Sequence, residues 1–335
     1  LGIQGKEQIE AYGLEKFNRI CRESVFTYKD EWERITARIG FWRDLEHPYV
    51  TLENDYIESV WWCLRQFWEK GYVYEGFKIL PYCPRCETPL SSHEVSQGYA
   101  ETEDPSVFVK FQSADDPNLY YLAWTTTPWT LISNVALAVR GNEPYVRVRL
   151  LPRLNKDGSA KADTGHAAGQ ELILAKARLS ALYGPYEVVA EFPGADLMEK
   201  RYVPLFPFFK DKPDAFRVLT ADYVTMEDGT GVVHTAPAFG EDDYRLGQAH
   251  GLPAVRPVGR SGEFTDEVPP WAGVFVKKAD PSIIESLKES GHLYTATTFT
   301  HSYPFCWRCD SPLIYYARDS WYLKTTAFRE RMVAA

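Results

Sequence analysis

The decapeptide PYCPRCETPL at residues 81–90 returns as PFCWRCDSPL at residues 304–313. Each copy places two cysteines three positions apart between prolines, and an acidic and a hydroxyl residue follow the second cysteine. The four cysteines of the two copies are Cys83, Cys86, Cys306 and Cys309. If they bind one metal ion, the chain must leave and return at the same place after a block of about 200 residues. The repeat therefore predicts a domain inserted into another domain.

Two Cys-x-x-Cys pairs supply the four soft ligands of a closed, structural zinc site. Two alternatives remain open: a metal site that has lost its function, and a dithiol–disulfide couple. Redox pairs usually occur singly at the start of a helix in a thioredoxin-like unit, and the sequence lacks that pattern. His93 and His301 lie near the pairs and are possible substitute ligands. Cys21 and Cys63 stand alone in helical patterns, where we expect buried small side chains.

The composition is that of an ordinary globular protein with room for two domains: 335 residues, 45% of them hydrophobic. The net charge of −9 argues against a protein that attracts nucleic acid with its whole surface. We find no run of about 18 apolar residues and no signal-peptide pattern, so we expect a soluble, cytoplasmic protein that does not associate with membranes. The chain begins without Met, and we expect it to be a piece of a longer protein.

Helical periodicity dominates the first part of the chain. Residues 54–71 repeat apolar side chains on one helical face, with Asp55 and Glu58 as a predicted capping box and Gly71 as a predicted end. Weaker helical patterns cover 8–23 and 30–38.

From residue 99 the pattern changes to that of an α+β domain. Residues 152–169 are polar and small, as in a surface loop or a hairpin tip. We predict strands at 107–111, 119–124, 135–139, 146–150, 186–191, 216–220, 231–235 and 272–276, and helices at 170–182, 241–250 and 281–290.

One candidate site is WTTTPWT, residues 124–130. A run of β-branched residues ended by Pro128 is compatible with a plain strand. Alternatively, Thr125, Thr126 and Thr127 present hydroxyl and backbone N–H groups together at a strand end, which suits a ribose or a polarised ester.

The other candidate is GTGVVHTAPAFGEDDYRLG, residues 229–247. Gly229 and Gly231 permit a tight backbone before a short strand. Acids in the first turn of the following helix are ordinary partners of the helix dipole. A His at a strand end followed by three carboxylates also forms a pocket for an ammonium group, and the spacing does not decide between the two interpretations. Neither a catalytic triad nor a phosphate-binding glycine loop is visible.

Together, WTTTPWT, GTGVVHTAPAFGEDDY and the block between the Cys-x-x-Cys pairs resemble the editing insertion of the isoleucyl-tRNA synthetases, a class I aminoacyl-tRNA synthetase family. TLENDYIESVWW and RDSWYLKTT resemble the family's catalytic segments that flank this insertion. The resemblance implies an α/β protein, namely part of a Rossmann-type catalytic domain with an inserted α+β editing domain and a zinc knuckle. The implied domains are catalytic at 1–80, first knuckle at 81–98, editing at 99–298, second knuckle at 299–313, and catalytic again at 314–335.

The resemblance also implies a reaction. Isoleucyl-tRNA synthetases are the standard example of an apolar pocket that discriminates poorly between isoleucine and valine, since one methylene contributes only ~1–3 kcal/mol. A second site hydrolyses the misacylated Val-tRNA(Ile). By resemblance, Thr125, Thr126 and Thr127 contact the terminal adenosine and the ester.

Further roles carried over from the family concern the amino-acid side of the substrate. Trp129 shapes the pocket, His234 helps to exclude isoleucine, and Asn134 binds nearby. Asp243 pairs with the α-ammonium group and orients the ester toward water, since charge-assisted pairing is strong and directional.

The family's HIGH and KMSKS motifs are absent from these residues. ATP and Mg²⁺ are therefore expected only for the full-length enzyme. The implied partners are the acceptor end of tRNA(Ile), isoleucine and valine, and a monomer is expected. Two alternatives are a valyl-type enzyme that removes threonine and a non-catalytic zinc-ribbon module that binds RNA. Basic side chains for tRNA would come from scattered residues such as Arg147, Arg149, Lys210 and Lys212.

Overall fold

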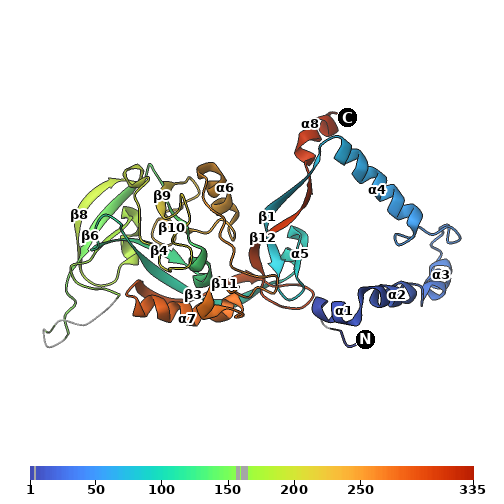
Figure 1. Cartoon of the computed structure of the whole chain (residues 1–335), viewed down its shortest axis with the longest axis horizontal. Helices are drawn as coiled ribbons and strands as arrows, with labels where there is room; N and C mark the ends of the chain where they lie inside the picture. The colour runs from blue at the N-terminus through green and yellow to red at the C-terminus, as the bar shows by residue number, and fades with distance from the viewer. Residues whose placement is uncertain (4, 156–158, 160–164) are drawn as a thin grey trace. The chain divides into compact units, whose positions relative to one another are not determined.

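The computed structural model describes residues 1–3, 5–155, 159 and 165–335 (Figure 1). Within the segment 152–169, predicted as a loop or hairpin tip, residues 156–158 and 160–164 lie outside the described residues. The chain forms two compact units: Leu1–Phe77 with Asp319–Ala335, and Lys78–Arg318. Among the described helices, none has both the length and the apolar character that a membrane span requires.

The first unit is mainly helical. The predicted helix 8–23 is interrupted at Gly13, which has a φ of +98°. The predicted Asp55–Glu58 capping box is wrong: the N-cap is Glu53 and has no side-chain cap, so that Asp55 already lies in the first turn, where its charge favours the helix dipole. The helices are α1 (Lys6–Tyr12), α2 (Leu14–Val25), α3 (Lys29–Arg38), α4 (Asn54–Glu69), η5 (Thr325–Phe328) and α8 (Arg329–Ala334).

Large apolar side chains of this unit are exposed. Trp61 is 66% and Trp68 is 60% exposed, although Trp68 packs against Trp321 with 5.7 Å between ring centroids. Cys21 and Cys63 are exposed as well, so the expectation that they are buried is wrong. The reason is that α2, α3 and α4 contain no buried residue, and these cysteines have no core to enter.

The second unit is built on a mixed sheet that has nine strands among the described residues. Its path is β8-β6-β7-β4-β10-β5-β9, and β3 joins β4 to β11. β4 runs parallel to β7 and β10 but antiparallel to β3. The strands are β3 (Tyr99–Gln112), β4 (Leu119–Thr125), β5 (Ala136–Val139), β6 (Pro144–Leu150), β7 (Glu171–Ala175), β8 (Tyr186–Pro193), β9 (Arg217–Thr220), β10 (Val232–Thr235) and β11 (Leu293–Pro304).

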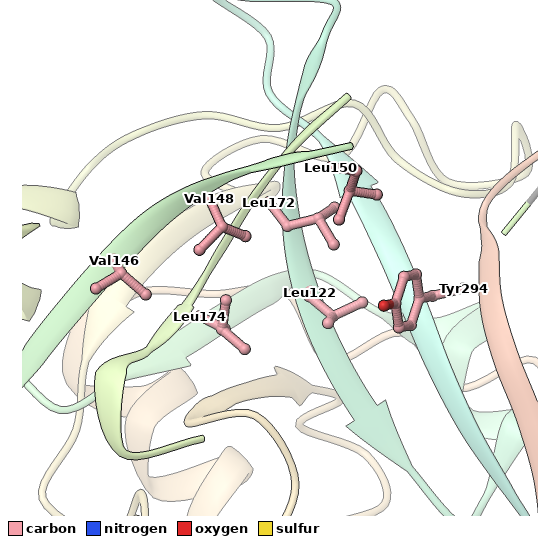
Figure 2. Close-up of a cluster of buried hydrophobic side chains, with 7 residues drawn as sticks. All are labelled: Leu122, Val146, Val148, Leu150, Leu172, Leu174 and Tyr294. Atoms are coloured by element: carbon pink, nitrogen blue, oxygen red, sulfur yellow. The ribbon is translucent and has the colours of Figure 1, made fainter. Parts of the chain in front are cut away.

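Alternate residues of β4, β6 and β7 form one part of the core, shown in Figure 2. The side chains point into a common layer that Tyr294 of β11 closes. Each is at most 2% exposed, and burial of one such aliphatic side chain contributes about 1.5–3 kcal/mol. The members are Leu122, Val146, Val148, Leu150, Leu172, Leu174 and Tyr294.

The helix predicted at 170–182 is wrong. Residues 171–175 form β7, a strand between β4 and β6 with every residue buried, and only a 3₁₀ segment, η2 (Lys176–Ala181), follows. Leu, Ala, Lys and Arg favour helices locally, but pairing on both edges and burial of both faces override that weak preference.

The end of the unit departs from prediction in two ways. The strand predicted at 272–276 is absent, because Gly273 has a φ of +73° and interrupts the extended backbone between isolated bridges. The helix predicted at 281–290 is α7 (Val276–Glu289), which begins five residues earlier. Pro281, the first residue of the predicted range, lies inside this helix. The predicted helix 241–250 is confirmed as α6 (Glu241–His250).

The two ends of the strand-rich block lie side by side. β3 and β11 pair antiparallel from Leu293 opposite Val109 to Pro304 opposite Tyr99. At the Tyr99–Pro304 end, the chain continues into the two cysteine hairpins. Beside them stand a short helix, α5 (Ser92–Ser96), and a three-stranded sheet in the order β12 (Ile314–Leu323), β1 (Val73–Cys83), β2 (Thr88–Pro89).

Candidate functional site

The Thr-rich motif forms a turn at the end of β4. Thr127 N donates to Thr125 Oγ1 at 3.1 Å, and the two hydroxyl oxygens lie 3.2 Å apart. Pro128 then starts a 3₁₀ helix, η1 (Pro128–Ser133), as expected for a residue that has a fixed φ and no N–H. Thr126 is half-buried and makes no side-chain hydrogen bond to a described residue, so its hydroxyl can serve a ligand.

His234 lies next to this turn because β10 and β4 are parallel neighbours, with Val233 opposite Trp124. Its Nε2 lies 2.9 Å from Thr130 Oγ1, and both side chains are buried. Burial lowers the pKa of His234 to about 4, so the imidazole is neutral near pH 7. Gly231 makes the preceding turn with a φ of +74°, and a Cβ there would lie 2.4 Å from Ala175 Cβ.

Asp243 enters the site from the first turn of α6. Its Oδ2 accepts a hydrogen bond of 2.9 Å from Ala236 N, two residues after His234. Desolvation raises the pKa of this half-buried carboxyl group to about 6, although the Ala236 N–H opposes the rise. A Cβ at Gly240 would lie 2.8 Å from Asp243 Oδ2, so a side chain there would push the carboxylate out of this position.

The other two acids of this turn point away from the site. Glu241 pairs with Arg245 at 2.5 Å, Asp242 lies 3.8 Å from the same guanidinium, and all three are exposed. Of the three carboxylates, Asp243 alone bonds the backbone of the β10–α6 turn in the described structure. Glu241 and Asp242 thus fit the ordinary role of acids in a first turn, whereas Asp243 does not.

Several buried polar atoms of this region have no hydrogen-bond partner among the described residues: Tyr223 Oη, His234 Nδ1 and Thr235 Oγ1. The Tyr223 hydroxyl lies near both the Asp243 carboxylate and the Thr235 hydroxyl, but neither Tyr223 nor Thr235 makes a hydrogen bond of good geometry there. Buried polar groups are normally paired, so the Tyr223 and Thr235 hydroxyls indicate a ligand or water site near Asp243. Tyr223 and Thr235 were not predicted from the sequence.

The two sequence-predicted binding residues differ in what they contact. Trp129 is buried and packs its ring against the edge of Phe239, with centroids 4.9 Å apart. Asn134 donates to Ala136 O at 2.9 Å and accepts from Tyr202 Oη at 2.6 Å. The Asn134 amide therefore holds the turn after η1, and its position does not bring it to Asp243 by any contact among the described residues.

A residue that sequence reasoning missed holds the start of η1. Asp280 of α7 is 4% exposed, and its Oδ1 accepts a hydrogen bond of 2.8 Å from Trp129 N. Burial raises the pKa of Asp280 to about 7. No local signal could have identified it, because the two residues are 151 positions apart.

The four predicted cysteines come together. Their sulfur atoms all lie within 4.8 Å of one another, with Cys83 Sγ and Cys86 Sγ at 3.5 and 3.6 Å from Cys309 Sγ. Four sulfurs at tetrahedral corners around one zinc ion are separated by about 3.8 Å, so the cluster fits such an ion. Cys306 completes the set.

The repeated decapeptides fold into equivalent hairpins. Leu90 N donates to Pro81 O at 2.8 Å, and Leu313 N donates to Pro304 O at 3.1 Å. The acidic residue after the second cysteine has a left-handed backbone conformation in both copies, with a φ of 49° at Glu87 and 55° at Asp310.

The two histidines near the cysteines lie outside the cluster. His301 Nε2 binds Asp104 Oδ2 at 3.0 Å, and His93 is exposed on α5. Neither belongs to the group of possible metal ligands in the described residues.

Two arginines that were expected to contact tRNA already have carboxylate partners. Arg147 pairs with Asp116 at 3.0 Å and with Glu171, and Arg149 pairs with Glu171 at 2.8 Å and with Glu187 at 2.7 Å. Their charge is largely compensated within the sheet surface.

Comparisons with known proteins agree along the whole chain. The family profile described as tRNA synthetases class I (I, L, M and V) matches residues 1–335. Isoleucine–tRNA ligase of Clostridium acetobutylicum is 53% identical over 333 residues, which are 99% of this chain and 30% of that protein. The isoleucine–tRNA ligase of Bacillus thuringiensis is 48% identical over 331 residues, 98% of this chain and 30% of that protein.

Among solved structures, the P. knowlesi cytosolic leucyl-tRNA synthetase editing domain aligns with a TM-score of 0.42 and 13% identity, over 61% of this chain and 98% of that one. The chain spans 30% of the length of the C. acetobutylicum relative. Because the family profile extends from the first residue to the last, the chain belongs to the class I tRNA synthetases of the isoleucine, leucine, methionine and valine group.

Proposed function

We propose that this chain is a segment of an isoleucine–tRNA ligase and that its strand-rich unit hydrolyses valine misattached to tRNA(Ile). The observation that carries the proposal is that Thr130 of the Thr-rich motif contacts His234, while Asp243 binds the backbone two residues after His234 in the same strand-to-helix turn. The 53% identity to an isoleucine–tRNA ligase across 99% of the chain supports the choice of isoleucine over the other amino acids of the family.

Asp243 pairs with the α-ammonium group of the misattached amino acid. With a pKa of about 6 the carboxyl group is ionised near pH 7, and a cation beside it favours the ionised form further. Ala236 N fixes one carboxylate oxygen and leaves the other for the ammonium group. The pairing sets the direction in which the ester carbonyl faces.

The Thr-rich turn holds the other end of the substrate. The hydroxyl groups and backbone N–H groups around Thr125, Thr126 and Thr127 bind the terminal adenosine and the ester. Neutral His234, which Thr130 holds, and Trp129 line the pocket for the amino-acid side chain. The valine side chain fits this pocket, and the larger isoleucine side chain is excluded. Asn134 supports this pocket from the turn after η1.

No protein nucleophile is needed for the reaction. The oxygen of a water molecule bonds to the ester carbonyl carbon, the ester C–O bond breaks, and the ribose oxygen leaves with a proton that came from the water. The site contributes orientation, which alone can supply a large rate factor when the reacting atoms are held in line.

The cysteine cluster binds one zinc ion with a structural role. Cys83, Cys86, Cys306 and Cys309 fill all four positions, which leaves no open position for catalysis. When bound, the metal cross-links the two hairpins at the base of the β3–β11 pair.

The domain boundaries follow from this assignment. Residues 1–80 and 314–335 are parts of a Rossmann-type catalytic domain, 81–98 and 299–313 form the knuckle, and 99–298 form the editing domain. The whole enzyme uses ATP and Mg²⁺, charges tRNA(Ile) with isoleucine in the cytoplasm, and is a monomer.

The proposal is tested with the full-length enzyme on preformed aminoacyl-tRNAs. We expect rapid deacylation of Val-tRNA(Ile), slow deacylation of Ile-tRNA(Ile), and loss of the first reaction in Asp243→Ala. A preference for Thr-tRNA(Val) would instead favour a valyl-type enzyme. Binding of RNA without hydrolysis, unchanged in Asp243→Ala, would point to a non-catalytic zinc-ribbon module.

A further inference from the structure

We propose that Asp280 is a positioning residue for the editing reaction: from α7 it fixes the turn that carries Trp129 and Thr130. The inference rests on the proposed function, because the turn matters for activity only if the Thr-rich site hydrolyses an ester. Asp280 itself does not need to touch the substrate.

The 3₁₀ helix η1 has no cap of its own. Its N-cap residue, Thr127, makes no side-chain cap hydrogen bond to the first turn. The first N–H groups of a helix have no partner within the helix and must be satisfied from outside. Asp280 Oδ1 supplies that partner for Trp129 N at 2.8 Å, in a buried contact between residues 151 positions apart.

This contact completes a three-point attachment of η1 to the rest of the site. Thr130 is tied to His234 of β10 at 2.9 Å, and the Trp129 ring rests against Phe239 of the β10–α6 turn. Asp280 adds the only backbone anchor from α7 among the described hydrogen bonds. Without it, the main chain at Trp129 is free to shift while its side chain stays packed.

A buried carboxyl group loses its hydration, so the hydrogen bond from Trp129 N to Asp280 must compensate part of that loss. Asp280 is 4% exposed, and Lys277 one turn earlier on α7 partly compensates its charge. Lys277 is itself paired with Asp104 at 3.0 Å and lies 3.8 Å from the centroid of the Tyr303 ring. A buried carboxylate with a shared cation needs its own hydrogen-bond donor, and Trp129 N provides it.

The test compares Asp280→Ala with Asp280→Asn in the full-length enzyme. The alanine variant loses the acceptor, and we expect kcat for Val-tRNA(Ile) deacylation to fall by up to about 100-fold, as small misplacements can produce. The asparagine variant keeps an acceptor oxygen for Trp129 N and retains most of the wild-type rate. Glu285→Ala, an exposed carboxylate on the same helix, is the matched control and leaves the rate unchanged.

Two further measurements separate positioning from general damage. ATP-dependent charging of tRNA(Ile) with isoleucine and the affinity for tRNA(Ile) stay at wild-type values in Asp280→Ala. Deacylation at the wild-type rate in Asp280→Ala would overturn the inference, and so would an equal loss of charging and deacylation. Absence of Val-tRNA(Ile) deacylation in the wild type would overturn the proposed function itself.

Discussion

Thr130 Oγ1 lies 2.9 Å from His234 Nε2, and this contact joins two motifs that are 104 residues apart in the chain. It holds the ring of a buried, neutral histidine whose other nitrogen, Nδ1, has no partner among the described residues. The Thr-rich turn and the β10 strand end therefore behave as one site.

Thr130→Val should loosen the His234 ring. The variant keeps the shape of the side chain but removes the hydroxyl, which leaves His234 Nε2 buried without a partner and costs about 1–3 kcal/mol. We expect lower stability in urea and faster hydrolysis of Ile-tRNA(Ile), because His234, which we propose excludes isoleucine, is no longer held in place. Unchanged discrimination between the valyl and isoleucyl substrates would contradict this role.

The editing rate should fall at acidic pH. The pKa of Asp243 is about 6 in the folded protein, so the carboxylate that we propose pairs with the ammonium group is lost as the pH drops below that value. His234 stays neutral down to a pH of about 4, so its protonation does not contribute to this fall in rate. Single-turnover deacylation of Val-tRNA(Ile) between pH 5 and 8 measures the effect; a flat profile would rule it out.

Asp243→Asn should stabilise the protein while it abolishes editing. The raised pKa means that the folded state binds the proton more tightly than the unfolded state, so stability falls as the pH rises from about 4 to about 6 and stays lower above it. Removing the charge should raise the free energy of unfolding by about 1–3 kcal/mol at pH 8 and by almost nothing at pH 4. Unfolding in urea at both values checks this, with exposed Asp242→Asn as the control.

Each chain should release one zinc ion on denaturation with a chelator present. Cys309→Ser removes one of four ligands and should lower metal retention and the stability of the two hairpins. Cys21→Ser changes an exposed cysteine far in sequence from the cluster and should change neither. Metal analysis of the purified protein decides, and metal-free protein with readily alkylated thiols at Cys83 and Cys306 would refute the site.

Leu172→Ala should destabilise the strand-rich unit by about 2–5 kcal/mol. Leu172 is fully buried between β4 and β6, and its removal leaves a cavity in the layer shown in Figure 2. Val188→Ala on the same sheet is the comparison, since Val188 is 51% exposed. Equal losses of unfolding free energy in the two variants would contradict the assigned core.

Local sequence signals predicted several elements to within two residues at each end. Residues 241–250 form the predicted helix, ended by Gly251 with a φ of +69°, and β4, β8 and β10 lie within two residues of the predicted strands. The gathering of the four cysteines was predicted from the repeat and is confirmed.

What the sequence could not predict depends on contacts between distant residues. Residues 171–175 favour a helix locally and become a strand only because β4 and β6 flank them. In the sequence, Asp280 is one more acidic residue on an amphipathic helix. Only the fold brings it to Trp129 N. Tyr223 carries no motif, and its place beside Asp243 depends on the turn before β10.

The register of β3 against β11 bears on how such a block can be moved between proteins. Because Tyr99 is paired with Pro304, the block begins and ends at positions whose Cα atoms are about 5 Å apart. A recipient protein needs only a surface turn of that width to accept the 206-residue span from Tyr99 to Pro304, and its own backbone need not be stretched. The pairing of β3 with β11 therefore makes the block insertable as one unit, and the cysteine hairpins mark the point of insertion.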